Sequence, residues 1–483
     1  MTSGPEAGLP AGWGLELDRG TRRTDGGRVL IGGSPFRVLR LSPTGAELLG
    51  RLSAGDPLPR ADPARRLARR LVNAALAHPR PPPAEVLRPA DVSVVIPVRD
   101  EPHRLGPTIA ALGSVREIVV VDDGSTAPAA VRSAAGAATV LRHDRPRGPA
   151  AARNVGWRST TGTVVAFVDA DVTADAGWLP PLLAHLGDPA VGAVAPRVRS
   201  SPGDAPGWLA AYEAARSPID LGPTPALVRP RTRVAYVPTA LLVVRRAALE
   251  DVDGLDEHLL YGEDVDLVWR LDAAGWRVRY EPVSTARHPV RPDLRAWLEQ
   301  RYRYGSSAAT LAARHGDVVA PLGTSGWSAA AWGAVLVGHP LAGAALASVT
   351  TAALVPKLDS LQHPAREALR IAGGGHLWAG RSVADALRRP WWPLSLLLAW
   401  AWPRSRPALV AAATVPALLD WQERSPALDP LRFAALRLLD DLAYGTGVWA
   451  GCLRARSGRA LVPGFTGPID PPATLGRAGP GET

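Results

Sequence analysis

The chain has 483 residues, more than one typical domain, and its 46% share of hydrophobic residues is ample for a sizeable core. Its formal net charge of +10 comes almost wholly from arginine, which suits phosphate-bearing partners, but no basic patch is interleaved with aromatic residues, so nucleic-acid binding is not expected. The single cysteine, Cys452, excludes an intrachain disulfide and a cysteine-based zinc site.

Residues 1–80 predict a small α+β domain. Two short strands are expected on either side of Gly32 and Gly33, followed by a helix with Ser42 as its N-cap and Pro43 at its first position. A second amphipathic helix is expected over residues 64–77. The first 14 residues lack the basic and apolar regions of a signal peptide, so the body of the protein is expected in the cytoplasm. The proline-rich stretch over residues 78–89 predicts a stiff linker, which sets a linker boundary of 81–90.

Residues 91–310 alternate short apolar runs with helical stretches. Strands are expected over 92–98, over the start of 117–126, over 163–168 and over 191–198. Alternation at this spacing is typical of a parallel, doubly wound α/β sheet, in which ligands bind beyond the carboxyl ends of the strands.

Polar side chains gather at three of these strand ends. An aspartate at a single strand end commonly serves only to form a turn. Acidic residues at several strand ends along one rim of a sheet indicate a binding site instead. Carboxylates two residues apart can both reach a hard cation such as Mg²⁺ or Mn²⁺. The absence of GxxxxGK[ST] and GxGxxG argues against a P-loop NTPase or a dinucleotide enzyme. The residues concerned are Arg99, Asp100, Glu101, Asp122, Asp123, Asp169 and Asp171.

Five stretches in order, VSVVIPVRDE, IVVVDDGST, RGPAAARNVG, FVDADV and YGEDVDLVWRLDAAGW, resemble family 2 glycosyltransferases of the GT-A fold. The resemblance implies an inverting transfer of a sugar from a nucleotide diphosphate. It implies a metal held by Asp169 and Asp171, with Asp171 the direct ligand. It also implies nucleotide-sugar contacts from Pro97, Arg99, Asp100, Glu101, Asp122, Asp123, Arg153 and Asp169.

Glu263 and Asp264 are expected at the start of a helix whose buried side is apolar. Carboxylates are favoured at a helix N-terminus, so simple capping is one interpretation. The resemblance implies another, in which Asp264 is the general base that deprotonates the acceptor hydroxyl and Glu263 supports the acceptor side. An inverting displacement needs one such base and no enzyme nucleophile.

Two further features carry weaker predictions. His288 follows a strand-like run; it is either a surface histidine or, as related GT-A enzymes imply, part of the metal shell. Gln300, Arg303 and Tyr304 form QxxRY, similar to the QxxRW of processive enzymes such as cellulose synthases, where the motif lines the acceptor end of the glucan. Tyr replaces Trp here, so a chance match stays open.

Residues 311–460 predict a mainly helical region. The stretch 318–356 has no formal charge and could form a re-entrant hairpin at His339, while 390–403 and 407–421 are short, Trp-rich and bounded by proline. Membrane association is expected, with a soluble helical bundle as the alternative. Residues 461–483 are expected to be disordered.

The N-terminal section resembles PqqD-like domains, which grip precursor peptides by adding them as an edge strand; a plain structural subdomain is the alternative. With the catalytic core and the ending DDLAYGTGVWAGCLRAR, the chain resembles the mycofactocin-system glycosyltransferases. This implies UDP-glucose as donor, a peptide-derived redox cofactor as acceptor, β-1,4-linked glucose units, and a place at the cytoplasmic face of the membrane. A lipid-linked envelope acceptor and a non-catalytic peptide-binding adaptor are the alternatives.

Overall fold

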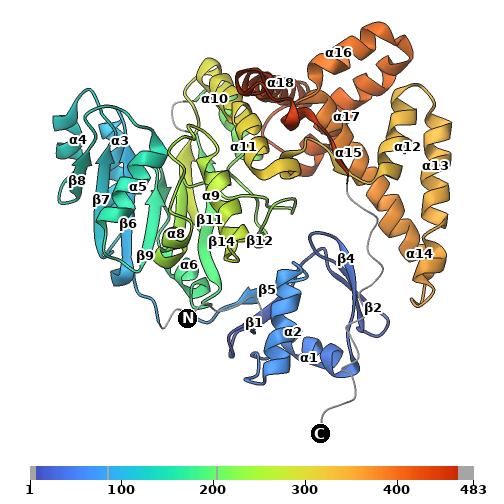
Figure 1. The fold of residues 1–483 in the computed structure, drawn as a ribbon, viewed down its shortest axis with the longest axis horizontal. Coiled ribbons are helices and arrows are strands. Elements are labelled where there is room, and N and C mark those ends of the chain that lie inside the picture. The colour runs from blue at the N-terminus through green and yellow to red at the C-terminus, as the bar shows by residue number, and fades with distance from the viewer. Residues whose placement is uncertain (1–6, 84–85, 203–204, 466–483) are drawn as a thin grey trace. The chain divides into compact units, whose positions relative to one another are not determined.

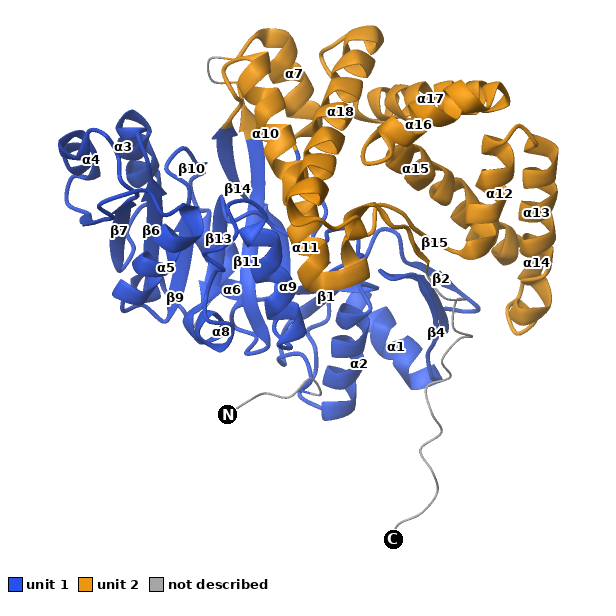
Figure 2. Cartoon of the chain, turned by 45° about the horizontal axis from the view of Figure 1, so that its top comes forward, with its two compact units in different colours: residues 1–199, 218–288, 470–483 blue, residues 200–217, 289–469 orange. Residues whose placement is uncertain are grey.

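The computed structural model describes residues 7–83, 86–202 and 205–465 (Figure 1). The chain divides into two compact units, shown in different colours in Figure 2. Unit 1 comprises residues 1–199, 218–288 and 470–483, and unit 2 comprises residues 200–217 and 289–469. Three stretches that carry sequence predictions lie outside the described residues. They are 1–6 at the N-terminus, where no signal peptide was predicted, 84–85 in the predicted linker, and 466–483 in the predicted disordered tail.

A nine-stranded sheet forms the centre of unit 1. Its order is β10-β14-β11-β13-β9-β6-β7-β8, with β12 paired to β14. The central strands are rich in β-branched residues and have both faces covered, so all of residues 92–98 and 164–168 except Pro97 are buried. The strands are β6 (Val92–Val98), β7 (Glu117–Asp122), β8 (Thr139–Arg142), β9 (Val164–Val168), β10 (Thr173–Ala174), β11 (Val191–Ser201), β12 (Ala226–Val228), β13 (Leu241–Arg245) and β14 (Arg277–Pro289).

The predicted strands are present, but the expectation of a wholly parallel sheet was wrong. β8, β7, β6 and β9 are parallel, whereas β13 enters between β9 and β11 and runs antiparallel to both. Its sequence, LLVVR, is as apolar as the others, and strand direction depends on the path of the chain rather than on composition. The sheet is therefore mixed, and β13 begins beside the end of β9, where Asp169 N donates to Ala240 O at 3.0 Å.

Short helices cover the sheet (Figure 1). Pro149 occupies the first turn of α5 as predicted, because a proline there loses no helical hydrogen bond. Gly262, at φ 80°, forms the left-handed turn into α9. These helices are α3 (Pro102–Ala111), α4 (Pro128–Ala135), α5 (Pro149–Ser159), α6 (Leu179–His185), α8 (Arg246–Asp251) and α9 (Glu263–Ala273).

The N-terminal part of unit 1 has its own core and two small sheets. Ser42 caps α1 by accepting from Gly45 N at 3.1 Å, as predicted. The proline-rich stretch over residues 78–89 is not a linker from its first residue: residues 78–80 belong to β5, which pairs with β1 because the chain returns to cover the leucines of α1 and α2, and β5 ends before the predicted linker boundary at 81. The elements are β1 (Gly14–Leu17), β2 (Arg22–Thr24), β3 (Val29–Gly32), β4 (Arg37–Arg40), α1 (Pro43–Ser53), α2 (Asp62–Asn73) and β5 (Ala77–Arg80).

The described residues of unit 2 are mainly helical and include one short parallel strand pair, β15 (Gly323–Thr324) and β16 (Gly464–Phe465). A helical hairpin is present where a re-entrant one was expected, since α12 and α13 pack against each other on either side of His339; its entry into a membrane stays a prediction. The helices are α7 (Gly207–Arg216), α10 (Leu294–Ser306), α11 (Ala308–His315), α12 (Gly326–Leu336), α13 (Pro340–Ala352), α14 (Pro364–Ala368), α15 (Gly374–Arg388), α16 (Trp392–Ala401), α17 (Arg406–Arg424) and α18 (Pro430–Ala455).

The helices α10 and α18 cross where Gly447 allows their backbones to approach closely. A Cβ on Gly447 would lie 2.0 Å from Tyr302 O, so no larger residue fits unless the backbones separate. We expect Gly447→Ala to lower the free energy of unfolding by about 1–3 kcal/mol, although alanine is the better helix former. Urea denaturation measures this. The control is Thr446→Ala, an exposed position one residue earlier, which should change stability by less than about 0.5 kcal/mol.

Candidate active site

Two loops at the carboxyl ends of β6 and β7 are tied together. Asp100 N donates to Ser125 Oγ at 3.0 Å, and Thr126 donates to Asp100 Oδ1 from both N and Oγ1 at 2.8 Å. These bonds from Thr126 hold the pKa of Asp100 below its usual value. Arg99 and Glu101 remain at the surface of the same rim. The rim loop predicted to contact the nucleotide is thus preformed.

Asp122 and Asp123 are buried, and their carboxylates are committed to the surrounding backbone. Asp122 accepts from Ser125 N at 2.8 Å and pairs with Arg142. Asp123 accepts from Arg147 N and Gly148 N, both at 2.8 Å. They therefore shape the loop over residues 143–148, and direct contact of either with a nucleotide stays a prediction.

His143 is a residue that the sequence analysis missed. Its Nδ1 lies 2.7 Å from Asp123 Oδ1, and the side chain is buried. It follows β8, whose parallel pairing with β7 brings its carboxyl end to the same rim. The signal was present: a short run of β-branched and apolar residues ending in Arg-His-Asp at residues 142–144, which the sequence analysis did not identify as a strand.

The structure brings Asp171 and His288 together. Asp171 Oδ2 and His288 Nε2 are 3.5 Å apart, and both side chains are largely buried. Two ligands of one divalent cation, each about 2.1 Å from it, lie roughly 3 Å apart, so this pair fits one edge of a metal shell. Within residues 7–83, 86–202 and 205–465, no group of three His, Cys, Asp or Glu side chains could hold a metal. The protein would supply part of the shell only.

Asp169 faces a different partner from Asp171. Arg153, from α5, donates to Asp169 Oδ1 at 2.6 Å and to Glu263 Oε1 at 3.0 Å. Its side chain is 4% exposed, and the Nε atom is buried without a hydrogen-bond partner. Arg153 thus links the end of β9 to the start of α9, a role that the sequence analysis did not assign.

Asp264 lies next in this acidic cluster. Burial, and then the neighbouring charge of Glu263, raise the pKa of Asp264 to about 7. Burial also raises the pKa of Glu263, which Arg153 partly counteracts. A carboxyl group with a pKa near the pH of the cell can exist as a base and accept a proton. The cluster formed by Arg153, Asp169, Glu263 and Asp264 therefore contains a carboxyl group that can act as a general base.

Removal of the Arg153 charge should destabilise unit 1. We expect Arg153→Met to lower the free energy of unfolding by about 3 kcal/mol, because two carboxylates lose their buried counter-charge. The control is Arg158→Met on the same helix, whose pair with Asp253 is exposed and should cost less than about 1 kcal/mol. Urea denaturation compares the two, and equal losses would contradict a bridging role for Arg153.

The three QxxRY residues lie on α10 in unit 2. Arg303 pairs with Glu299 one turn earlier, and Gln300 Oε1 accepts from Arg301 at 3.1 Å. Arg301 itself is buried and pairs with Asp440 at 3.0 Å and with Glu213. The acceptor role predicted for Gln300, Arg303 and Tyr304 stays a prediction.

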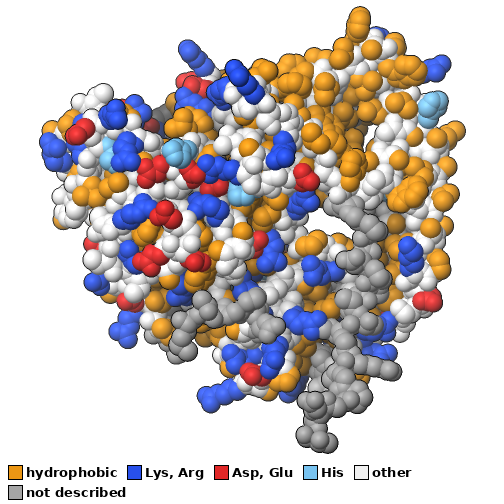
Figure 3. All heavy atoms as spheres, in the orientation of Figure 1, with side chains coloured by type: hydrophobic (Ala, Val, Ile, Leu, Met, Phe, Trp, Pro, Cys, Tyr) orange, Lys and Arg blue, Asp and Glu red, His pale blue; other side chains and the backbone are white. Residues whose placement is uncertain are grey.

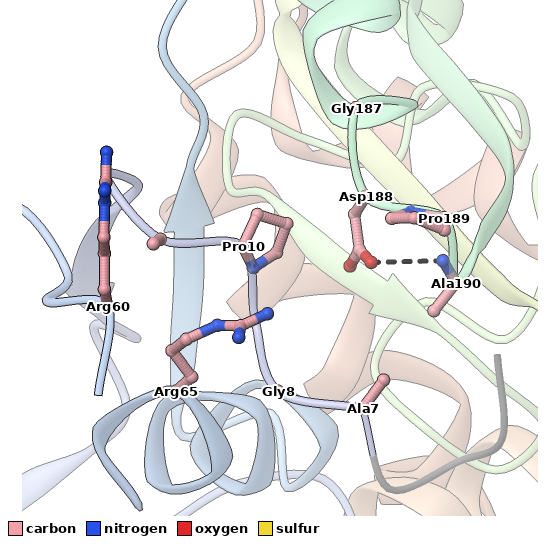
Figure 4. Close-up of a pocket in the computed structure, with 10 residues that line it drawn as sticks. Ala7, Gly8, Pro10, Arg60, Arg65, Gly187, Asp188, Pro189 and Ala190 are labelled. Carbon is pink, nitrogen blue, oxygen red and sulfur yellow. Dashed lines mark hydrogen bonds between the residues drawn. The ribbon is translucent and has the colours of Figure 1, made fainter. Parts of the chain in front are cut away.

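A pocket of about 510 Å³ lies elsewhere in unit 1, between residues 7–11 and residues 187–190 (Figure 4). Arg60 and Arg65 contribute its basic side chains, and Asp188 Oδ1 accepts from Ala190 N at 3.1 Å on its wall. Among the described residues that line it, none is a strand-end carboxylate. The pocket is therefore separate from the candidate active site.

Comparison with known proteins connects this site to a family. Residues 93–252 match the model of glycosyl transferase family 2. A pre-mycofactocin glycosyltransferase of Mycobacterium tuberculosis is 42% identical over 474 residues, which cover 94% of this chain and 98% of the relative. An uncharacterized glycosyltransferase of Mycobacterium bovis is 32% identical over 212 residues, covering 42% of this chain and 91% of that protein.

Among solved structures, a mannosyltransferase of Pyrobaculum calidifontis, in complex with GDP-Man and Mn²⁺, has a TM-score of 0.38 and 22% identity. It covers 74% of this chain and 89% of that one. The family model and the mixed α/β sheet support a GT-A-like fold. Since the Mycobacterium tuberculosis relative is matched along nearly its whole length, this chain belongs to the pre-mycofactocin glycosyltransferases of family 2 and is a glycosyltransferase.

Proposed function

We propose that the protein transfers glucose from UDP-glucose to a hydroxyl group of pre-mycofactocin, a peptide-derived redox cofactor, with inversion at the anomeric carbon. Repeated transfer would build a β-1,4 oligoglucoside. The name of the Mycobacterium tuberculosis relative supports the acceptor. The observation that carries the chemistry is the cluster in which Arg153 bridges Asp169 and Glu263 next to Asp264; burial there raises the pKa of Asp264 to about 7, which suits a base for an acceptor hydroxyl.

The reaction is a single displacement. The acceptor oxygen forms a bond to the anomeric carbon as the bond from that carbon to the diphosphate oxygen breaks. Asp264 accepts the proton of the attacking hydroxyl, and UDP carries away the electron pair of the broken bond. Glu263 and Arg153 hold the start of α9 against the end of β9, which keeps Asp264 at the rim where the donor would bind.

A divalent cation, Mg²⁺ or Mn²⁺, would be held by Asp171 and His288, with the donor diphosphate and water as its other ligands. When bound, it would neutralise the charge that develops on the leaving diphosphate. Asp169 would contribute through Arg153, which donates a hydrogen bond to Asp169 Oδ1 at 2.6 Å, rather than as a second direct carboxylate ligand.

The rate should depend on the protonation of Asp264. A base with a pKa of about 7 is protonated and inactive below that pH. We therefore expect kcat/KM to rise about tenfold per pH unit up to roughly pH 7 and then to level off. Arg153 lowers the pKa of Asp264, so Arg153→Met should move this limb to higher pH. A pH profile with no limb between pH 5 and 8 would remove Asp264 as the base.

The N-terminal part is proposed to bind the precursor peptide. In the three-stranded sheet, β3 is central, so β2 and β4 each present one edge without a partner strand among the described residues. An extended peptide could add to such an edge by main-chain hydrogen bonds. A peptide titration followed by backbone NMR shifts at residues 37–40 would test this site.

The proposed function is tested by mass spectrometry of pre-mycofactocin after incubation with the protein, UDP-glucose and Mn²⁺ or Mg²⁺. A ladder of hexose additions that disappears with EDTA is expected. A single addition would retain transfer and exclude repeated transfer. If pre-mycofactocin is unchanged while a lipid-linked sugar acceptor is extended, the proposed acceptor is wrong although the chemistry is right.

A further inference from the structure

Unit 2 carries an apolar face formed by α12, α13, α16 and the first two-thirds of α17. Residues 326–352, 392–401 and 407–419 contain no Asp, Glu, Lys or Arg. Many of their large apolar side chains are exposed, and orange side chains gather over α13 and α16 in Figure 3. The exposed residues of this face are Trp327, Val337, Leu341, Val349, Leu394, Leu396, Leu397, Trp400, Val410, Val415, Leu418 and Leu419.

A cluster of charged side chains is buried and paired in the interior of the same unit. Asp441 is 1% exposed and lies within 3.2–3.4 Å of Arg388, Arg389 and Arg437. Arg437 also pairs with Asp420 at 2.6 Å. Soluble domains ordinarily bury apolar groups and expose charge, whereas helices in contact with lipid pair their charges inside the bundle. The buried ion pairs of unit 2 are of the kind found in helices that contact lipid.

Basic side chains border the apolar face at both ends of α13. At one end, Trp402 Nε1 donates to Val337 O at 3.0 Å, which brings the exposed Arg404 and Arg406 beside the turn between α12 and α13. At the other end lie the exposed Lys357, Arg366 and Arg370, with two acidic neighbours: Asp359, and Glu367, which pairs with Arg370 at 3.3 Å. This excess of positive charge complements the anionic headgroups of a membrane, and tryptophan is favoured at the same depth.

The lengths of these helices argue against crossing a bilayer. Residues 340–358 are long and apolar enough to cross, and 11% of that stretch is buried. However, α12 has 11 residues and packs against α13, so it spans about 16 Å, roughly half of the 30 Å hydrocarbon layer. The regular helix α13 has 13 residues and spans about 20 Å, which is also less than this layer. A hairpin of two helices this short fits within one leaflet, where the basic groups that flank it can all meet the same layer of headgroups.

We propose that unit 2 is a monotopic membrane anchor, whose apolar face lies in one leaflet of an anionic membrane while the flanking arginine and lysine side chains bind the lipid headgroups. In the cell this would be the cytoplasmic leaflet, which carries anionic lipid. The anchor goes beyond the proposed glycosyl transfer and does not depend on the identity of its acceptor.

Vesicle flotation of the full chain tests the anchor. We expect the protein to float with vesicles of phosphatidylcholine and phosphatidylglycerol and much more weakly with phosphatidylcholine alone. Leu341→Asp changes a side chain that is 85% exposed and should lower the partition coefficient at least tenfold, by order of magnitude. Arg404→Gln with Arg406→Gln should lower it about 25-fold on anionic vesicles, since each basic residue contributes roughly fivefold.

The matched control is Leu431→Asp, because Leu431 is 80% exposed in the same unit but lies outside the apolar face. Circular dichroism shows whether each variant is folded. Equal flotation of wild type and both leucine variants would overturn the proposal. So would a lipid-free dimer, detected by analytical ultracentrifugation, that Leu341→Asp dissociates, because the face would then bind a second copy.

Cysteine labelling distinguishes a helix that lies along one leaflet from a helix that crosses the bilayer. In a Cys452→Ser background, His339→Cys and Asp359→Cys place a thiol at either end of residues 340–358, the stretch that is long and apolar enough to span among the described residues. With vesicles added first and an impermeant maleimide outside, both thiols should react in the proposed arrangement. If one position reacts only after detergent is added, the helix crosses the bilayer and the proposal is wrong.

Discussion

Replacement of Asp264 by Asn should abolish glycosyl transfer, lowering kcat by about 10³-fold or more. The amide has the same shape but cannot accept the proton of the acceptor hydroxyl, and general base catalysis contributes about 10²–10⁴-fold. Steady-state release of UDP, measured with saturating donor and acceptor, gives kcat. Because donor binding does not need the base, the affinity for UDP should stay within about twofold of the wild type.

The same substitution should stabilise the fold above pH 7. Folded Asp264 holds its proton up to about pH 7, whereas the unfolded chain releases it near 3.8, so stability falls as the pH rises through that window. The full cost is present above pH 7, with an upper limit of ~4 kcal/mol. Since the side chain is partly exposed, we expect Asp264→Asn to raise the free energy of unfolding at pH 8 by about 1–3 kcal/mol.

The control on the same helix is Asp272→Asn. Asp272 pairs with Arg229 at 2.9 Å, and the acidic cluster around Arg153 does not include it. This variant should retain activity and gain no stability. If Asp264→Asn is active, or if it is inactive and also destabilised, the carboxylate is structural and capping of α9 becomes its better explanation.

Replacement of Asp171 by Ala is the second change with a large expected effect. The variant would lose the metal that assists the departure of the diphosphate, so turnover should fall by about 10³-fold or more. Asp123→Asn should be milder: it weakens the bonds that order residues 143–148, which raises KM and lowers stability while kcat changes less. The measurement is kcat and KM for UDP-glucose across a Mn²⁺ titration.

Metal dependence distinguishes the two ligands proposed for this edge. His288→Ala leaves the carboxylate in place, so excess Mn²⁺ should restore much of its activity, whereas Asp171→Ala should not recover. Ordinary transfer by Asp171→Ala, or full wild-type activity in EDTA, would exclude the metal site formed by Asp171 and His288.

Local sequence predicted many elements because local physics forms them. Continuous β-branched runs gave β6, β7 and β9, and Ser42 with Pro43 gave the start of α1. The helix at Glu263 followed from its apolar spacing. Strand direction was not local: β13 reverses the sheet because of a long chain path from β11 that no short window contains.

The candidate site divides in the same way. Local sequence predicted Asp169 and Asp171 at a strand end and Glu263 and Asp264 at a helix start, because carboxylates in these positions are recognisable from their neighbours; the catalytic role of Asp264 came from the family resemblance and stays a prediction. The partners of those carboxylates were decided by tertiary structure. Arg153 binds Asp169, 16 positions away, and thereby gives it a different partner from that of Asp171. His143 contacts Asp123, 20 positions away.

The sequence by itself therefore determined the family, the transferase chemistry and the helical character of the C-terminal half, since each depends on residue identity in short ordered stretches. Only the three-dimensional fold decided the direction of β13 in the sheet, the pKa of Asp264 and the burial of the ion pairs around Asp441 in unit 2. Those properties arise from burial and from charges brought together across long separations in the chain, and neither quantity can be computed before the chain path is known.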